Sequence, residues 1–600
     1  MRHLKVCASV LALSIVAFSS AAQAQTYGRL VVFGDSLSDN GNLFRATRGT
    51  NPPSPPYFQG RFSNGPVFTE LLGFPNLQNF GAVTGNVNNA FGGARTDLQA
   101  SPPSLQVQLN AYLGGGGRFG AGDLVSVYGG ANNIFQSIQA ASTSANPLGF
   151  LTGVSVTAAN DIGALTGRIA AAGAGTVVVY NLPNLGATPQ FATGPAAQLV
   201  NLGGSAAFNA RLATQVAAAA QANTATNFIL VDVERANAAV RSSPAVFGFA
   251  NITTPCLNVA TGAVCSNPDS FLYFDGVHPT AAGHRFLAAV AADYLFYGAR
   301  GAATVAQAEA ALGHREQALD AALQQMEGEL EEGPQLAVSI EGAEASEDAR
   351  GDVPDIERST VSLRAAVNTR LSPTMSAGVM GSVARSDVEA GPLSFEARSL
   401  GVDAFVGWRS GPVFVKGVFG GGLDEYDDIA RVTGVGPLVQ SADRVTGSTV
   451  SGTLQAGWVG RYGGLSVSPR AALSAVRVEV DSYEEVGFSA RHAVAAREVE
   501  AFGAEASVRL EAELGSQLTG HLEGGYGDYL SYDGDAAIAL VDNPAKPLTI
   551  SPEDPGRGFL VDAGVDGRVF GGWQLGVAYR GRFDDGSQSH AALLKLNLRR

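Results

Sequence analysis

The sequence predicts an α/β domain with a parallel sheet, followed by a C-terminal transmembrane β-barrel of about 12 strands. Three observations lead to this prediction. The chain starts with a leader-like segment, short β-branched runs alternate with Ala-rich stretches from about residue 27 to 298, and apolar residues recur at every second position from about residue 335 onward. The length agrees, because 600 residues are too many for one hydrophobic core.

Residues 1–24 have the features of a secretory signal peptide. They combine basic residues, a short apolar run and a small-residue ending at Ala22-Gln23-Ala24. A transmembrane anchor is the alternative, but the apolar run is shorter than the roughly 20 residues that a spanning helix needs. We therefore expect cleavage after Ala24.

The cysteines and the net charge limit the chemistry and the partners. Once the leader is removed, Cys256 and Cys265 remain, close together in a chain bound for an oxidising compartment, so we expect a loop-closing disulfide. Two thiols make only half of a zinc site, and no metal site is expected. A net charge of −15 argues against a nucleic-acid partner.

Residues 25–298 predict the α/β domain. Four β-branched runs have the length of buried strands, and helical stretches lie between or after them. This alternation implies a parallel sheet covered on both faces, with functional residues in the loops at the carboxyl ends of its strands. The predicted strands are 29–33, 123–128, 176–180 and 227–233, and the helical stretches include 154–172, 204–222 and 280–297.

Residues 299–334 predict a linking helix of about 26 residues, roughly 40 Å long. Its apolar side chains fall at helical spacing, and Gly333-Pro334 ends it. Taken alone, this helix could equally pack on its own domain. The apolar positions are Leu319, Leu323, Met326 and Leu330.

Residues 335–600 predict the barrel, because the hydrophobic period changes to two. For example, Val361, Leu363 and Val367 alternate with Ser362 and Arg364. Roughly a dozen such segments, each with an apolar and a charged face and with aromatic residues near strand ends, are typical of a transmembrane barrel. A soluble β-sandwich is the alternative, but charges repeated along one face of long strands suit a wet lumen better than a dry core.

The segment 25–298 contains only two histidines, which limits the choice of a general base. His278 follows Asp275 by three residues, a spacing that lets the carboxylate orient the imidazole. His284, at the start of the last helix, is interpreted as structural. Ser36, just after the first strand, is a candidate nucleophile. On these residues alone, the Asp275–His278 pair could equally be a structural turn.

An oxyanion hole needs hydrogen-bond donors near such a nucleophile. Gly92-Gly93 allows close approach of a ligand to the backbone, although a Gly-Gly pair is usually only a turn. Asn132 follows the second predicted strand, where an asparagine more often caps a helix. Neither feature carries much weight by itself.

Four segments together resemble the conserved blocks of the GDSL (SGNH) lipolytic hydrolases. They are "FGDSLSDNGN" (33–42), "NNAFGGA" (88–94), "GGANN" (129–133) and "DGVHPT" (275–280), and "NLPNLGATP" (181–189) is also familiar in this family. The resemblance implies an SGNH-hydrolase fold with a flavodoxin-like parallel sheet. It also implies a nucleophile at Ser36, a base at His278 and an orienting acid at Asp275. The implied oxyanion donors are the Ser36 backbone N–H, Gly93 (with Gly92 as the alternative) and the Asn132 side chain.

Two positions depart from the family pattern. The third block usually reads Gly-x-Asn-Asp, and Asn133 stands here in place of the aspartate, which puts in doubt the local network that holds Asn132. The chain ends in Arg600, where such barrels usually end in an aromatic residue. The G-x-S-x-G elbow of the α/β-hydrolases is absent around Ser36, which disfavours that rival fold.

The whole layout resembles GDSL autotransporter esterases of Gram-negative bacteria. The resemblance implies a barrel in outer-membrane lipid, inserted by the barrel-assembly machinery, with the linking helix threaded through it and the hydrolase domain displayed on the cell surface. We expect a monomer whose hydrolase domain stays attached.

The expected reaction is hydrolysis of carboxylic esters, with short- to medium-chain acyl groups or lipids, by a Ser-His-Asp mechanism that needs no metal or organic cofactor. The alternatives are an acyltransferase or a carbohydrate deacetylase that uses the same triad, and a surface adhesin with a vestigial site. Residues 55–80 are a candidate wall for the acyl chain, although they could equally be helix and loop packing.

Overall fold

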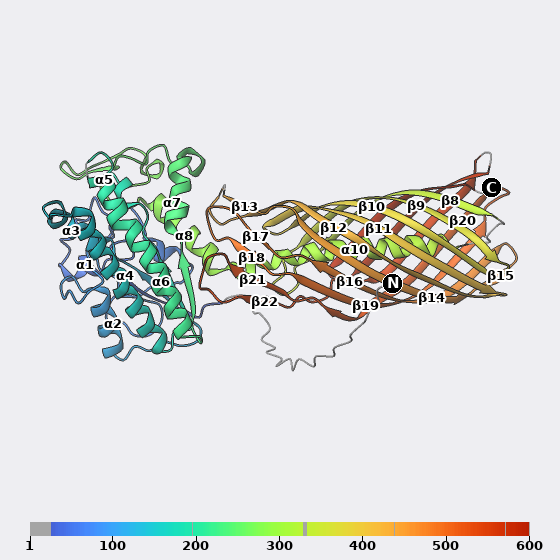
Figure 1. The fold of residues 1–600 in the computed structure, drawn as a ribbon, viewed down its shortest axis with the longest axis horizontal. Coiled ribbons are helices and arrows are strands. Elements are labelled where there is room, and N and C mark those ends of the chain that lie inside the picture. The colour runs from blue at the N-terminus through green and yellow to red at the C-terminus, as the bar shows by residue number, and fades with distance from the viewer. Residues whose placement is uncertain (1–25, 195, 328–332, 437, 570–571, 599–600) are drawn as a thin grey trace, which may run out of the picture.

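The protein consists of an α/β domain and a β-barrel joined end to end, with a helix running from one into the other (Figure 1). The computed structural model describes residues 26–194, 196–327, 333–436, 438–569 and 572–598. The predicted signal peptide lies outside these residues and stays a prediction.

The α/β domain is built on a five-stranded, all-parallel sheet, as the alternating pattern predicted. The sheet order is β2-β1-β3-β4-β5, the order of flavodoxin-like folds. The short β2 was not predicted, because two residues are too few for a pattern. The strands are β1 (Arg29–Gly34), β2 (Val87–Asn88), β3 (Asp123–Tyr128), β4 (Thr176–Tyr180) and β5 (Asn227–Val231).

Helices cover both faces of this sheet, and side-chain caps fix where several begin. In α4 (Pro147–Ala171), the Asn146 side chain accepts a hydrogen bond from the Gly149 N–H, so the helix starts seven residues before the predicted stretch. The predicted stretch 204–222 becomes α6 (Ala207–Ala222), preceded by a π-helical turn. The others are α1 (Asn42–Ala46), α2 (Leu105–Gly114), α3 (Ala131–Ser142), α5 (Ala196–Leu199), α7 (Val233–Ser242) and α8 (Ala281–Leu295).

The linking segment enters the barrel as α10 (Val305–Gln324), after α9 (Tyr297–Gly301). Helix α10 runs inside the barrel, and most of its side chains are buried. It is shorter than the predicted helix, and barrel side chains also bond carbonyls near its end. Asn368 donates to the Gln325 carbonyl at 2.7 Å, and Lys416 donates to that of Leu323 at 3.5 Å. Leu330 lies outside the described residues.

Among the described residues, twelve long antiparallel strands form the barrel, as predicted, and the β11–β12 and β8–β25 pairs close it. Closure removes the exposed edges that an open sheet would leave. The strands are β8 (Pro334–Glu347), β9 (Ile356–Ser372), β10 (Met375–Ala390), β11 (Leu393–Ser410), β12 (Val413–Val432), β14 (Val445–Trp458), β16 (Leu465–Val480), β19 (Arg497–Glu513), β20 (Leu518–Asp533), β23 (Gly558–Arg568), β24 (Trp573–Asp584) and β25 (Ser587–Leu598).

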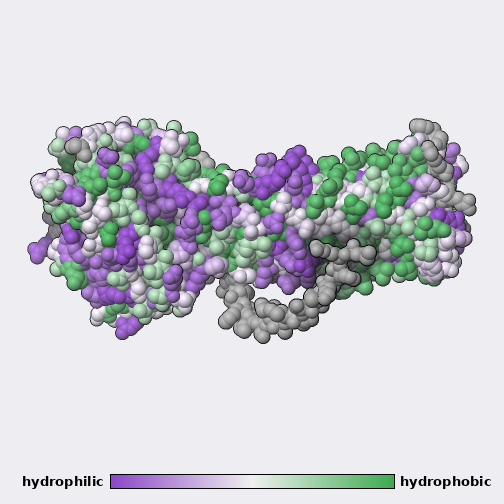
Figure 2. Space-filling model, viewed as in Figure 1, coloured by the Kyte–Doolittle hydropathy of each residue, from purple (hydrophilic) through white to green (hydrophobic). Residues whose placement is uncertain are grey.

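The apolar face of the barrel strands points outward. Val361 and Leu363 of β9 are about half exposed, whereas Arg364, next to Leu363, is buried on the inner face. Figure 2 shows a hydrophobic surface over the part of the barrel far from the α/β domain, and a hydrophilic zone next to that domain. An apolar outer band with a polar interior is the arrangement that suits a bilayer.

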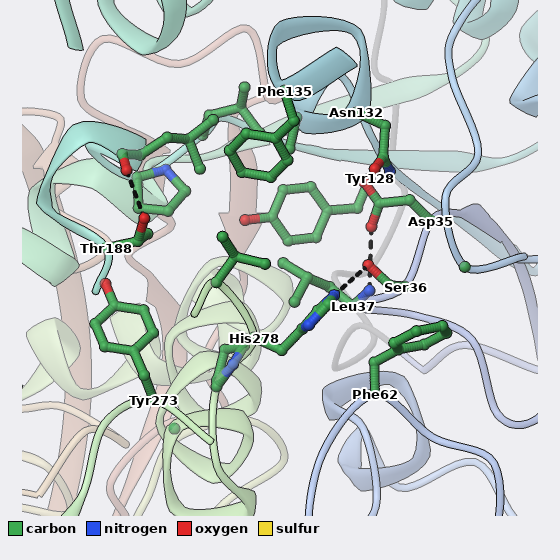
Figure 3. Close-up of a pocket in the computed structure, with 18 of the residues that line it drawn as sticks. Asp35, Ser36, Leu37, Phe62, Tyr128, Asn132, Phe135, Thr188, Tyr273 and His278 are labelled. Carbon is green, nitrogen blue, oxygen red and sulfur yellow. Dashed lines mark hydrogen bonds between the residues drawn. The ribbon is translucent and has the colours of Figure 1, made fainter. Parts of the chain in front are cut away.

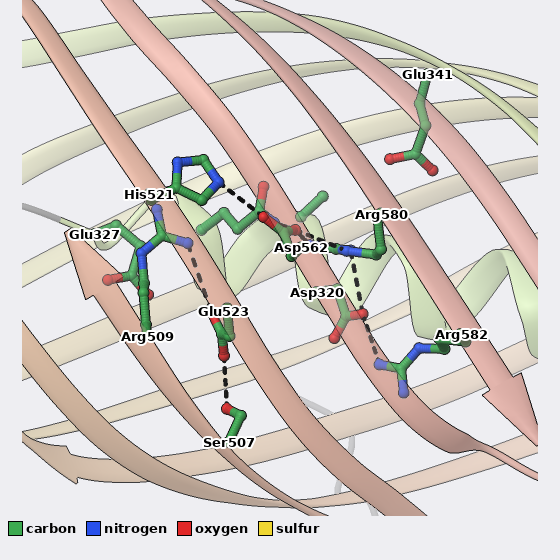
Figure 4. A network of polar contacts seen from close by, with 12 residues as sticks. Asp320, Glu327, Glu341, Ser507, Arg509, His521, Glu523, Asp562, Arg580 and Arg582 are labelled. Atoms are coloured by element: carbon green, nitrogen blue, oxygen red, sulfur yellow. Dashed lines mark hydrogen bonds and ion pairs between the residues drawn. The ribbon is translucent and has the colours of Figure 1, made fainter. Parts of the chain in front are cut away.

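The charged inner face pairs with helix α10. Asp320 of α10 lies between Arg580 and Arg582 of β24, 3.2 Å from each (Figure 4). Near the end of α10, Glu327 bonds Lys416 at 2.5 Å and Arg470 at 2.6 Å. The acidic side chains of this segment therefore neutralise basic side chains on the inner face of the barrel. The helix fills the lumen where these pairs form.

Barrel loops contact the edge strand of the α/β sheet. Asn543 accepts a hydrogen bond from the Leu230 N–H at 3.2 Å and donates to the Leu230 carbonyl at 2.6 Å, as a neighbouring strand would. The Lys546 N–H donates to Asn227 at 2.9 Å, at the start of the same strand. These contacts cover the edge of β5 and place the α/β domain at one end of the barrel.

Candidate active site

Ser36 lies in the loop after β1, and Asn132 lies in the first turn of α3, just after β3. These strands are adjacent, and the chain order reverses between them, which is where ligands bind in open α/β sheets. Gly34 allows the tight turn after β1, because a Cβ atom there would come within 2.9 Å of both Ser38 Oγ and the Tyr128 carbonyl oxygen. Figure 3 shows Ser36 between Asn132 and Phe62.

The fold brings Ser36, His278 and Asp275 into one hydrogen-bonded row. Ser36 Oγ lies 2.9 Å from His278 Nε2, and His278 Nδ1 lies 2.7 Å from Asp275 Oδ2. Phe62 packs on the His278 ring, with 5.0 Å between the ring centroids. This geometry lets the imidazole take a proton from the hydroxyl while the carboxylate holds the other ring nitrogen.

Asp275 sits in a turn that fixes its carboxylate. Its Oδ1 accepts hydrogen bonds from the backbone N–H groups of Val277 (3.0 Å) and His278 (2.8 Å). The preceding segment is held by the hairpin that the Cys256–Cys265 disulfide closes, since the Cys256 N–H donates to the Tyr273 carbonyl at 3.1 Å. The D-x-x-H spacing therefore corresponds to one turn that orients both groups.

Tyr57, which the sequence did not predict as a site residue, completes the surroundings of Asp275. Its hydroxyl donates to Asp275 Oδ2 at 2.6 Å, from a loop more than 200 residues away. Burial raises the pKa of Asp275, but His278 and these donors outweigh burial and hold that pKa below its usual range. Asp275 is thus an anion that stabilises a positive charge on His278. No local pattern around Tyr57 signals this contact.

Three hydrogen-bond donors border the cavity at Ser36. Among the described residues, no protein acceptor is recorded for the backbone N–H groups of Ser36 and Gly93. The Asn132 amide donates one hydrogen to the Ala94 carbonyl at 3.0 Å, which leaves its second hydrogen available. All three residues border the same cavity, so they can meet an oxyanion formed at Ser36.

The hydrogen bonds of Asp39 show which of the two glycines has a backbone N–H available for an oxyanion. Its Oδ2 accepts the Gly92 N–H at 2.8 Å, and its Oδ1 accepts the N–H groups of Gly41 and Asn42 at the start of α1. The Gly92 donor is therefore occupied, whereas Gly93, with a φ of 78°, follows it in a conformation that favours glycine. The structure supports Gly93 over Gly92 as a donor.

His284 is placed away from Ser36 as a structural acceptor. It is fully buried, and its Nδ1 accepts the backbone N–H of Phe68 at 3.2 Å. Burial, together with the nearby His278, lowers the pKa of His284 to about 3, so the ring stays neutral. This agrees with the interpretation of His284 as structural.

Ser36 and His278 open onto a cavity of about 400 Å³. Of residues 55–80, only Phe62 lines it, which favours helix and loop packing over an acyl-chain wall as the role of that stretch. Loops and helices that come later in the chain build most of the wall instead, because the cavity lies between the carboxyl ends of the strands and α7 and α8. The apolar lining includes Leu37, Leu43, Phe135, Leu182, Leu185, Val233, Leu272, Val277, Phe286 and Leu287.

The pH dependence of the site follows from His278. Burial lowers the pKa of His278, but the Asp275 carboxylate raises it by more, so it lies above the ordinary value of 6.5. A base must be neutral to accept a proton, so kcat/KM for a neutral aryl ester is expected to fall as the pH drops through that raised pKa. A pH profile tests this, and a midpoint below 6.5 would contradict it.

Within the described residues, no group of three or more His, Cys, Asp and Glu side chains is arranged to hold a metal ion. The polar groups that line the cavity include a serine hydroxyl, an imidazole and N–H donors, a set that can perform acyl transfer.

Both parts of the chain match known families. Residues 30–291 match the family described as GDSL-like Lipase/Acylhydrolase, and residues 336–580 match the Autotransporter beta-domain. Over 80% of its length the chain is 28% identical to Esterase EstA of Pseudomonas aeruginosa, covering 81% of that relative. Among solved structures, the translocator domain of the autotransporter NalP from Neisseria meningitidis aligns with 50% of this chain and 100% of its own, at 15% identity and a TM-score of 0.43.

Other relatives match shorter stretches of the chain. The chain is 46% identical over 79 residues to Phosphatidylcholine-sterol acyltransferase of Aeromonas hydrophila, and 28% identical over 285 residues to Thermolabile hemolysin of Vibrio parahaemolyticus. It spans 23% and 64% of the lengths of these two relatives.

Proposed function

The chain joins a hydrolase domain of the GDSL lipase family to an autotransporter β-domain of the Gram-negative outer membrane, and from this premise we propose that it is a cell-surface carboxylic ester hydrolase. The barrel anchors the protein, helix α10 carries the chain through the lumen, and the α/β domain stays attached outside. The substrate class is esters of short- to medium-chain acyl groups or lipids, whose apolar chain the cavity accommodates.

The reaction proceeds through an acyl-enzyme. Ser36 Oγ attacks the ester carbonyl carbon while His278 Nε2 takes the hydroxyl proton, and Asp275 stabilises the resulting imidazolium. The N–H groups of Ser36 and Gly93 and the Asn132 amide bind the oxyanion. His278 then gives its proton to the leaving alcohol. Water then attacks the acyl carbonyl carbon while His278 takes its proton, and His278 returns that proton to Ser36 Oγ as the acid leaves.

The observation that carries this proposal is the hydrogen-bonded row from Ser36 through His278 to Asp275, opening onto an apolar cavity beside three available donors. A vestigial site would not need to keep all of these groups in place. An adhesin is therefore the weaker alternative.

Activity of whole cells tests the proposal. Cells that produce the full chain are given p-nitrophenyl esters of graded acyl length, with and without prior protease treatment, and are labelled with a fluorophosphonate. We expect hydrolysis that protease removes, and labelling that depends on Ser36. Folded protein that neither hydrolyses any ester nor reacts with the phosphonate would overturn the proposal in favour of a binding role.

Acyl transfer is the second candidate, since one of the relatives is named an acyltransferase. The same acyl-enzyme would be formed, and an alcohol would replace water as the attacking group. Product analysis with a medium-chain ester and added alcohols separates the two reactions, because transfer yields a new ester and hydrolysis yields a free acid. A carbohydrate deacetylase would instead release acetate from acetylated sugars.

A further inference from the structure

Asn133, where the family pattern has an aspartate, belongs to a buried hydrogen-bonded row of its own. Its Oδ1 accepts the Thr96 backbone N–H at 3.1 Å, and its Nδ2 donates to Thr96 Oγ1 at 3.0 Å. The Thr96 hydroxyl in turn donates to Asp161 Oδ2 at 2.8 Å. Asn133 is 3% exposed and Thr96 is 1% exposed, so water does not easily replace the two hydrogen bonds between them.

The direction of these hydrogen bonds is fixed by proton count. A threonine hydroxyl has one proton, and Thr96 gives it to the Asp161 carboxylate, so it can only accept from residue 133. The Asn133 amide supplies that donor. An aspartate at position 133 would supply none and would place a second carboxylate against the same hydroxyl. The asparagine and Asp161 are therefore matched, with the acidic partner on α4 instead of α3.

This row holds the segment that carries the oxyanion donors. Thr96 lies three residues after Gly93 and two after Ala94, whose carbonyl accepts the Asn132 amide. Asn133 is the neighbour of Asn132 on α3. Thr96 and Asn133 thus connect the glycine segment to α3, and Asp161 connects both to α4. The relative position of the Gly93 N–H and the Asn132 amide depends on this connection.

We infer that Asn133, Thr96 and Asp161 form a positioning relay for the oxyanion hole, in which Asp161 takes the role of the acid that the third block lacks. The relay acts through Gly93 and Asn132 and does not touch the substrate. The inference rests on the proposed ester hydrolysis at Ser36. Misplacing an oxyanion donor weakens transition-state binding more than substrate binding, so kcat falls while KM stays nearly constant.

A swap of the two side chains tests the relay. N133D places two carboxylates against one hydroxyl, and we expect kcat to fall about 10- to 100-fold, as for a donor displaced by about 1 Å. D161N keeps an acceptor for the Thr96 proton, so its effect is expected to be small. In the N133D/D161N variant the row runs in reverse, because the new amide at position 161 donates to the Thr96 hydroxyl and that hydroxyl donates to the new carboxylate at position 133. There kcat is expected to recover to within about threefold of wild type.

A matched pair at Thr96 keeps the test falsifiable if N133D does not fold. Thr96→Ser retains the hydroxyl and Thr96→Val removes it at nearly equal volume, so the serine variant should keep kcat and the valine variant should lose it. The full-length protein in detergent is assayed for kcat and KM on a p-nitrophenyl ester. If wild type hydrolyses the ester and N133D or Thr96→Val keeps its kcat, or if the swap gives no recovery, the relay is overturned. If wild type neither hydrolyses the ester nor labels at Ser36, the proposed function fails instead.

Discussion

Replacing Ser36 by alanine is expected to lower kcat for an aryl ester by about 10⁶-fold, the scale of loss when the nucleophile of a serine hydrolase is removed. The reason is that His278 Nε2 then has no hydroxyl proton to take, and no acyl-enzyme forms. The barrel should still fold, because Ser36 follows β1 of the α/β domain and belongs to no barrel strand. Kinetics on the purified full chain and labelling by a fluorophosphonate measure the effect.

Ser142→Ala is the matched control for this prediction. Ser142 is exposed at the end of α3, and its hydroxyl donates only to the Gln139 carbonyl of its own helix, at 2.8 Å. Its loss should leave kcat and labelling unchanged. Activity in Ser36→Ala near the wild-type level would mean that another group performs the attack, and the proposed mechanism would be wrong.

Asp275→Asn is expected to lower kcat by about 10⁴-fold, the effect of the same change in a serine protease triad. Asparagine is nearly isosteric but is neutral and can donate its amide hydrogen to His278 Nδ1. The proton of the neutral imidazole would then lie on Nε2 and face Ser36, so the ring could no longer accept the hydroxyl proton. The positive charge formed on His278 would also lose its counter-charge.

The control for Asp275→Asn is Asp269→Asn, six residues earlier. Asp269 is mostly exposed and pairs with Arg285 at 3.3 Å, also on the surface, so its charge is screened by water. Its replacement should leave kcat unchanged. Thermal unfolding of both variants, followed alongside kcat, separates a folding defect from a catalytic one. A loss of less than tenfold in folded Asp275→Asn would remove Asp275 from the proposed mechanism.

The local sequence pattern was sufficient to predict those elements that are formed by residues close together in the chain. The β-branched runs predicted four of the five strands of the parallel sheet, and strict alternation predicted the barrel, because burial on one face of a strand imposes a period of two. The turn that joins Asp275 to His278 is also local, so its spacing could be read directly. The barrel contacts near the end of α10 were not predictable, because Asn368 and Lys416, which donate to carbonyls there, belong to strands far along the chain.

The sequence by itself therefore determined the two-part architecture and the candidates Ser36, Asp275 and His278, through motifs that lie within short segments. Only the tertiary structure decided which glycine has a free N–H, that Tyr57 bonds Asp275, and that residues after 80 build most of the cavity wall. It also decided that Asp161 accepts the hydroxyl proton of the threonine that Asn133 bonds. Each of these depends on the direction of a hydrogen bond or the packing of a side chain between segments far apart in the chain. Such contacts are fixed when the core closes, and no local period or spacing encodes them.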